Sequence, residues 1–148
     1  MPCGAGRAIL PVFQPLENRQ TMFTHIMVGT NDIARSKKFY DAVFAVLNIP
    51  PAEIDTRGRI TYGKHGDRFI VTPPLDGKPA TAANGGTIGL KADTPAMADA
   101  WHKAGVENGG QAIENPPGVR QTPVGPLYLA YLRDPDGNKL CIACKVPE

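Results

Sequence analysis

The hydrophobic and polar positions of this sequence follow the same pattern in two stretches. Thr24–Asp41 (THIMVGTNDIARSKKFYD) aligns without a gap with Gly86–Lys103 (GTIGLKADTPAMADAWHK), so that His25 lies over Thr87, 62 residues further on. Each copy opens with an alternating run, which places one set of side chains on one face of a strand. The hydrophobic members of these runs are Ile26, Val28, Ile88 and Leu90. We therefore expect both copies to begin as strands.

A pair of small polar residues follows in each copy, Asn31-Asp32 in the first and Asp93-Thr94 in the second. Side-chain oxygens of these residue types accept hydrogen bonds from the free N–H groups at a helix start. Hydrophobic residues then recur at helical spacing, with Phe39 and Trp101 in equivalent positions. The sequence therefore predicts a duplicated strand-helix unit.

The first helix is expected to end near Asn48, because Pro50-Pro51 cannot continue it. Short runs separated by turn residues follow and predict three strands. These strands span Glu53–Thr56, Arg59–Gly63 and Arg68–Thr72. A linker rich in Gly, Pro, Ala and Thr then extends to Gly86.

The second half repeats this order. Gly105 is expected to close its helix, since glycine suits the left-handed position after a last turn. A strand around Gln111–Glu114 and a long loop over Asn115–Pro126 follow. The last two strands, Leu127–Arg133 and Lys139–Lys145, are joined by an Asp-Pro-Asp-Gly-Asn turn, a composition typical of hairpins.

Length and charge limit the function classes. The 148 residues predict an irregular arm at 1–21 and a single domain at 22–148, with modules at about 22–74 and 85–146. The net charge is +2, and basic and acidic residues are interspersed, so we expect no nucleic-acid partner. No hydrophobic run is long enough to span a bilayer, and the cysteine count is low and odd. We therefore expect a cytoplasmic protein without a membrane partner.

The sequence resembles the vicinal oxygen chelate superfamily of glyoxalases, bleomycin resistance proteins and extradiol dioxygenases. Three segments carry the resemblance: the first strand and helix, the second unit that starts at Thr87, and Arg133–Lys139. The resemblance covers about Met22 to Lys145. It implies an α+β fold of two βαβββ modules that form one curved mixed sheet around a central cup, with the helices outside. It also implies a small-molecule ligand and a homodimer.

The family carries metal ligands at four positions of the cup. In this sequence they fall on His25, Ile70, Thr87 and Cys141. Only His25 and Cys141 offer an effective donor, whereas a catalytic divalent site usually has three protein ligands. We therefore expect a degenerate metal site and no bound cofactor. A divalent metal on His25 and Cys141 stays the alternative, with further ligands from a partner chain or a shifted strand register.

Strand alternation places small or polar residues on the face that would line the cup. They are His25, Met27, Thr87, Gly89, Cys141 and Ala143. We expect Tyr62, Tyr128 and Tyr131 to lie at the rim, together with Arg120, whose guanidinium suits a carboxylate or phosphate. Cys141 and Cys144 spell C-x-x-C, but their odd separation on a strand predicts two unlinked thiols on opposite faces.

Two functions follow from these residues. The first is a small-molecule binder, or an enzyme that works without a metal and uses His25 as a hydrogen-bond partner or general base. The alternative is a metal-dependent lyase or dioxygenase of the glyoxalase type. A purely structural module is disfavoured, because Thr87, Gly89 and Ala143 would leave the cup open.

Overall fold

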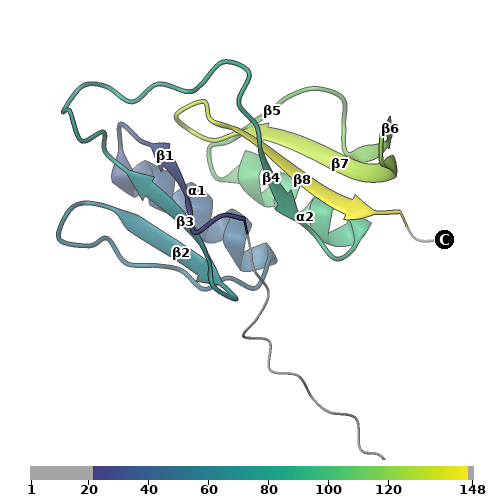
Figure 1. Cartoon of the computed structure of the whole chain (residues 1–148), viewed down its shortest axis with the longest axis horizontal. Helices are drawn as coiled ribbons and strands as arrows, with labels where there is room; N and C mark the ends of the chain where they lie inside the picture. Colours follow the sequence, from purple (N-terminus) through teal and green to yellow (C-terminus); the bar gives the residue numbers. More distant parts are fainter. Residues whose placement is uncertain (1–21, 147–148) are drawn as a thin grey trace, which may run out of the picture.

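A computed structural model describes residues 22–146, and the arm expected at 1–21 lies outside the described residues. The described part contains two helices and eight strands (Figure 1). In chain order they are β1 (Ile26–Gly29), α1 (Ile33–Val46), β2 (Ile60–Lys64), β3 (Asp67–Thr72), β4 (Ile88–Lys91), α2 (Pro95–Glu107), β5 (Gln111–Ala112), β6 (Gly118–Thr122), β7 (Gly125–Arg133) and β8 (Lys139–Lys145). The fold is α+β, as the sequence predicts.

The strands form two mixed sheets rather than the one curved sheet expected. The first has the order β1-β3-β2, and the second has the order β4-β8-β7-β5 with β6 paired to β7. Among the described residues no ladder joins the sheets, because β1 and β4 are edge strands that each pair on one side only. In Figure 1 these two edge strands lie on the inner sides of their sheets.

The register of the ladders supports the duplication. In the first sheet β1 runs parallel to β3, with Ile26 opposite Phe69. In the second sheet β4 runs parallel to β8, with Ile88 opposite Leu140. The sequence alignment places Ile88 over Ile26, and Leu140 takes the place of Phe69 in the pairing. The repeat is therefore present in the strand pairing as well as in the sequence.

The two helices begin and end in equivalent ways. Asp32 accepts a hydrogen bond from Arg35 N at 3.0 Å, and Thr94 accepts one from Met97 N at 3.1 Å. At the other end, α1 closes through Ile49 N to Phe44 O and α2 through Gly110 N to Gly105 O. The left-handed residue in these closing turns is Asn48 in α1 and Gly109 in α2.

The expected end of the second helix at Gly105 is wrong by two residues. Gly105 is buried inside α2, where an added Cβ would lie 2.2 Å from Leu132 Cδ1. Glycine is therefore present here for close packing of α2 on β7 rather than for its conformational freedom.

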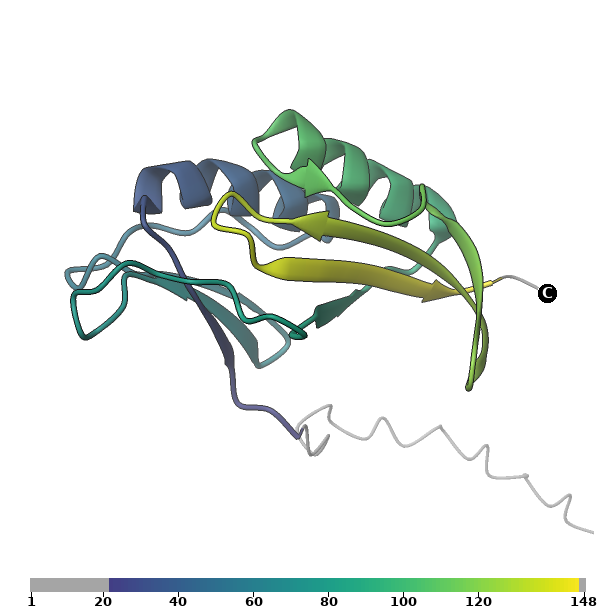
Figure 2. The ribbon, with the colours of Figure 1, turned by 90° about the horizontal axis from the view of Figure 1, so that it is seen from above.

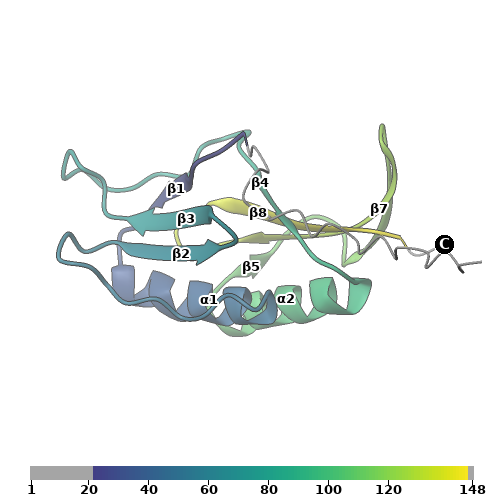
Figure 3. The ribbon, with the colours of Figure 1, turned by 60° about the horizontal axis from the view of Figure 1, so that its bottom comes forward.

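Both helices cover the same side of the sheets (Figures 2 and 3). The main core lies in this layer, and Phe39 and Trp101 are both fully buried in it. A three-ring group of Tyr40, Phe44 and Phe69 packs the first module, with ring centroids 5.1 to 5.6 Å apart. The opposite side of the sheets is left for the cup.

Two segments differ from the sequence prediction. Glu53–Thr56 is not a strand, and only Ile54 makes a single bridge, to Ile60. The reason is Asp55, whose carboxylate accepts from the backbone N–H groups of Arg57 and Arg59 and so closes a turn. The segment expected as a long loop contains β6, which forms a hairpin with β7.

The turn after β7 joins the second module to the first through Asp136. Its Oδ1 accepts from Asn31 N at 2.9 Å and from Arg35 Nη2 at 2.8 Å, and its Oδ2 lies 2.8 Å from Thr30 Oγ1 and 3.0 Å from Ser36 Oγ. Only 2% of its side chain is exposed. Asp136 therefore closes the N-terminal end of α1 from the other module.

Asp134 makes a second connection between the modules. Its carboxylate accepts from Tyr40 Oη at 2.6 Å and from the backbone and side chain of Asn138, which also donates to Gly29 O. The hydrogen bonds of Asp134 and Asp136 therefore give both aspartates a structural role, and we propose no catalytic or binding role for them.

Candidate functional site

The cup face is the side of the two sheets that points away from α1 and α2. In the first sheet it carries Met27 opposite Ile70. In the second sheet it carries Gly89 opposite Cys141, and Cys141 opposite Tyr131. This face is the place at which the sequence-predicted site residues were expected to meet.

His25 lies one residue before β1, and its side chain is exposed. Its Nδ1 is 2.9 Å from Thr24 Oγ1. The carbonyl of Thr24 accepts a long hydrogen bond from Arg68 Nε at 3.5 Å, which connects this segment to β3. The position continues the alternation of β1, so the imidazole lies on the same side as Met27.

Thr87 and Cys141 lie together on the second sheet. Thr87 is exposed and comes one residue before β4, two positions before Gly89 on the same side. Cys141 is 8% exposed, and its Sγ lies 3.6 Å from Ile142 O. Burial raises the pKa of the Cys141 thiol, and a hydrogen bond with Tyr131 offsets part of this effect. The structure shows no hydrogen bond from His25 to either residue among the described side chains.

Three further residues surround Cys141 and were not singled out as one site from the sequence. Lys139 Nζ lies 5.0 Å from the centroid of the Tyr131 ring, and the same ammonium pairs with Glu114. Burial is the main reason that the pKa of Tyr131 is raised. Strand alternation could have placed Lys139 and Tyr131 on the face of Cys141. Glu114 lies outside the strands, at a φ of 60°, so alternation could not have placed it.

Arg120 lies on β6 opposite Leu127, on the cup face. Its Nη2 donates to the carbonyl oxygens of Asn115 at 3.1 Å and Pro116 at 2.7 Å. Its Nη1 lies 3.4 Å from Val119 O. The guanidinium therefore braces the preceding loop and keeps Nε and one Nη1 hydrogen for another partner.

The expected positions of Tyr62 and Tyr128 at the cup rim are wrong. Tyr62 is 1% exposed on the helix side, where its hydroxyl donates to Asp41 of α1 at 2.7 Å. The hydroxyl of Tyr128 donates to Asp99 of α2 at 2.6 Å. Burial raises the pKa of Tyr62, and the hydrogen bond to Asp99 raises that of Tyr128. The alternation of β2 and β7 directs both rings toward the helices.

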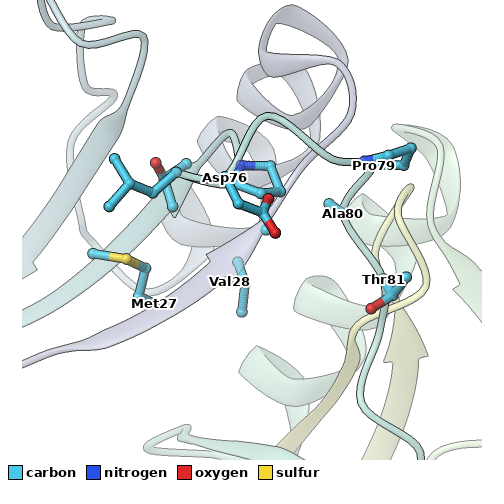
Figure 4. Close-up of a pocket in the computed structure, with 10 residues that line it drawn as sticks. Met27, Val28, Asp76, Pro79, Ala80 and Thr81 are labelled. Atoms are coloured by element: carbon cyan, nitrogen blue, oxygen red, sulfur yellow. The ribbon is translucent and has the colours of Figure 1, made fainter.

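A cavity of about 460 Å³ lies between β1 and the linker of residues 73–86 (Figure 4). It is lined by Met27, Gly29 and the linker residues Pro74 to Asp76 and Pro79 to Thr81, with Val28 and Thr72. Asn31 holds the linker here, because its side chain both donates to and accepts from the backbone of Ala80. His25, Thr87, Cys141 and Arg120 do not line this cavity.

The donor set fits a metal poorly. The four positions that the resemblance assigns to ligands are His25, Ile70, Thr87 and Cys141. Ile70 lies opposite Met27 and Cys141 opposite Gly89, while His25 and Thr87 each come one residue before their strand. No group of three or more His, Cys, Asp or Glu side chains that could hold a metal ion occurs in residues 22–146. One imidazole and one thiol whose pKa is raised do not make a three-ligand site within a single chain.

The described helices include none that is long and apolar enough to cross a membrane. Cys141 and Cys144 are free and buried, as expected for two thiols on opposite faces of β8.

Comparisons with known proteins agree with this fold. A search of curated proteins gives no significant match. Among solved structures, a glyoxalase/bleomycin resistance protein from Albidiferax ferrireducens T118 is 50% identical, covers 84% of this chain and 100% of its own, and has a TM-score of 0.82. Two more distant structures share the fold. A glyoxalase-related enzyme from Fulvimarina pelagi is 20% identical, covers 84% of this chain and 88% of its own, and has a TM-score of 0.62. A lactoylglutathione lyase from Agrobacterium tumefaciens is 17% identical, covers 84% of this chain and 93% of its own, and has a TM-score of 0.58. The sequence model of the Glyoxalase/Bleomycin resistance protein/Dioxygenase superfamily matches residues 22–142, and the chain belongs to this superfamily.

Proposed function

We propose that this protein binds a small molecule on its cup face and, if it is an enzyme, works without a metal through His25. The observation that carries the proposal is the donor set, because Ile70 and Thr87 occupy two of the four positions at which a metal would need ligands. Thr87, Cys141 and Arg120 would contact the ligand. Tyr62 and Tyr128 are left out, because their hydroxyls bond to the helices.

The exposed imidazole of His25 suits this role. Within residues 22–146 its one hydrogen-bond partner is the neighbouring hydroxyl of Thr24, at Nδ1, which leaves Nε2 for a ligand. Histidine exchanges a proton near neutral pH and can act as a general base toward a bound C–H or O–H group. The thiol of Cys141 is a poor nucleophile at pH 7, since burial favours its protonated form.

We also propose that the protein is a cytoplasmic homodimer. Support comes from large apolar side chains beside the edge strand β1, where Met22, Met27 and Leu75 are 89%, 46% and 105% exposed. Exposed apolar groups of this size near an unpaired strand edge favour association with a second copy. Light scattering over a tenfold range of concentration tests this, and a mass near that of one chain, 15.8 kDa, throughout would contradict it.

His25→Ala tests the proposed role of His25. A screen of small molecules by thermal shift first identifies a ligand of the full chain. We expect His25→Ala to abolish ligand binding without lowering the melting temperature, because the side chain is exposed and packs against little. His65→Asn is the matched control. His65 is exposed in the β2–β3 turn at φ 52°, and asparagine tolerates this conformation.

A chelator separates the proposal from its alternative, a metal-dependent lyase or dioxygenase. We expect a chelator to change neither binding nor any turnover. Loss of activity with chelator, or stoichiometric metal that copurifies with the wild type and is absent from His25→Ala, would favour the alternative. His25 supports that alternative in one respect, because it keeps an effective donor at the first ligand position.

A further inference from the structure

The charges of this protein are divided unequally between the two sides of its sheets. The eight described strands contain a single acidic residue, Asp67. The register of the ladders places six basic residues of these strands on the cup face. They are Arg68, Lys91, Arg120, Arg133, Lys139 and Lys145.

The acidic residues near the sheets are mostly engaged on the helix side or between the modules. Asp41 and Asp99 accept from the tyrosine hydroxyls of the helix side, and Asp136 pairs with Arg35. On the cup side Glu114 pairs with Lys139, and Asp76 lies in the linker beside β1. Acidic groups therefore neutralise only a small part of the positive charge of the cup face.

Two lysines of the second sheet have no ion-pair partner among the described residues. Lys91, on β4, lies opposite Ala143 of β8, and Lys145 is two residues further along β8 on the same side. Both are exposed. Neighbouring strands are about 4.8 Å apart, so the two ammonium groups can reach one bound group together.

An apolar floor lies beside these lysines. Lys145 is opposite Leu127, and Ala143 is opposite Leu129, on β7. Arg120 is opposite Leu127 on its other side. Figure 3 shows the first part of β7, next to its hairpin with β6, bending away from the helices, toward the cup side. Cations therefore border an apolar strip of the sheet, an arrangement that suits a molecule with an anionic group and a hydrocarbon body.

We infer that the ligand of the cup is a small organic anion, a carboxylate or a phosphate. Lys91 and Lys145 bind its charged group, and Arg120 adds positive potential and its remaining N–H donors. The carbon body packs on Leu129, Ala143 and the side of the sheet that carries Tyr131. This inference rests on the proposed function, because it names the class of ligand for the same cup.

Four probes with one ring system and different charges test this inference on the full chain. They are 2-naphthoate, 2-naphthyl phosphate, 2-naphthamide and 2-naphthylmethylamine, with dissociation constants measured by calorimetry at low and moderate salt. We expect the two anions to bind at least about fivefold more tightly than the amide and the amine to bind most weakly. Added salt should weaken the anions selectively, because exposed charges are screened. The two anionic probes also show whether the site prefers carboxylate or phosphate.

The double variant Lys91→Gln/Lys145→Gln locates the site. We expect about a tenfold loss of affinity for the anionic probes, with no change for the amide. The control is Lys38→Gln/Lys103→Gln, which removes the same charge from exposed positions of α1 and α2. An equal loss in the control would mean that net charge alone attracts the probes and would overturn the inference.

The remaining outcomes separate this inference from the proposed function. If the amide binds as tightly as the anions and His25→Ala abolishes that binding, the cup binds small molecules and the inferred ligand class is wrong. If none of the four probes binds the folded wild-type chain, both statements fail.

Discussion

Asp136→Asn is expected to destabilise the protein strongly, because this carboxylate is the main polar connection between the two modules. Four donors lie within 3.0 Å of its oxygens, and its side chain is 2% exposed. Asparagine keeps one acceptor oxygen but places an NH₂ group where the other oxygen accepted. Whichever oxygen is replaced, two of the four donors lose their acceptor, and in either orientation Arg35 loses the negative charge that it pairs with.

A hydrogen bond to a charged group contributes about 1.5–3 kcal/mol, and removal of one partner of a buried charge pair costs about 3–5 kcal/mol. Arg35 is 46% exposed and can return to water, which lowers the cost. We therefore expect a loss of roughly 2–4 kcal/mol in the free energy of unfolding. For a domain of this size it corresponds to a fall of about 5–15 °C in melting temperature.

Urea unfolding measures this loss, and the single tryptophan of the chain reports it. Trp101 is fully buried in α2, so its fluorescence should change on unfolding. Asp93→Asn is the control, because Asp93 is exposed and makes no hydrogen bond in the described part of the chain. A midpoint for Asp136→Asn equal to that of Asp93→Asn would refute the role assigned to this turn.

The same variant gives a pH dependence. Burial alone would raise the pKa of Asp136, but the hydrogen bonds from Asn31, Thr30 and Ser36 and the charge of Arg35 together lower it below its ordinary value of 3.8. A carboxyl whose pKa is lowered by folding stabilises the protein above pH 3.8, and this contribution is lost as the pH falls through the folded-state pKa. The difference between the wild type and Asp136→Asn should therefore be largest near neutral pH and should narrow as the pH falls below 3.8 and through the folded-state pKa.

Three further substitutions or reagents test other parts of the structure. Gly105→Ala should lower the free energy of unfolding, measured in urea, by about 1–3 kcal/mol, because the new Cβ would lie 2.2 Å from Leu132 Cδ1 and this clash outweighs alanine's better helix propensity. The control Val106→Ala, at the exposed neighbour, should change this free energy little. Gly89→Val should leave the melting temperature unchanged or higher but weaken ligand binding, because no atom lies within 4 Å of the new Cβ and the side chain enters the cup. Iodoacetamide should alkylate Cys141 slowly at pH 7 and faster as the pH rises, and peptide mapping that finds rapid modification at neutral pH would contradict the raised pKa of its thiol.

The elements that the sequence predicts well are those whose signals are local. The helix starts at Asp32 and Thr94 are confirmed, because a side-chain oxygen that bonds to the third N–H of the next turn is a property of a few consecutive residues. The strands that open the two halves are confirmed as well, because both halves carry the same alternation. β6 was missed, because the prolines on either side of it, Pro116, Pro117 and Pro123, resemble a loop and its pairing with β7 depends on a hairpin turn.

The side chains of the candidate site were harder to place. Tyr62 and Tyr128 were assigned to the cup rim by residue type, although the alternation of β2 and β7 directs them to the helices. Their partners Asp41 and Asp99 lie 21 and 29 residues away, so no local pattern indicates the contact. The link from Asp136 to Thr30 spans 106 residues and was read only as part of a turn. Contacts of this kind depend on how α1 and α2 sit on the sheets.

The duplication also separates residues that serve the fold from those that differ between the modules. Helix-facing positions are hydrophobic in both modules. Ile26 and Phe69 of the first correspond to Ile88 and Leu140 of the second, and all four pack on the core. Cup-facing positions carry different types of side chain in the two modules. The equivalent pairs are His25 and Thr87, Met27 and Gly89, Ile70 and Cys141, and Thr61 and Tyr131.

Core packing restrains both copies of a helix-facing position in the same way, whereas a cup-facing side chain is free to change unless a ligand restrains it. The first module fills its cup face with the large side chains of Met27 and Ile70, while the second opens space above Gly89 and surrounds it with cations. In the function proposed above, a ligand held by these two faces would therefore meet non-equivalent groups, with its charged end over the second module and the imidazole of His25 on the side of the first.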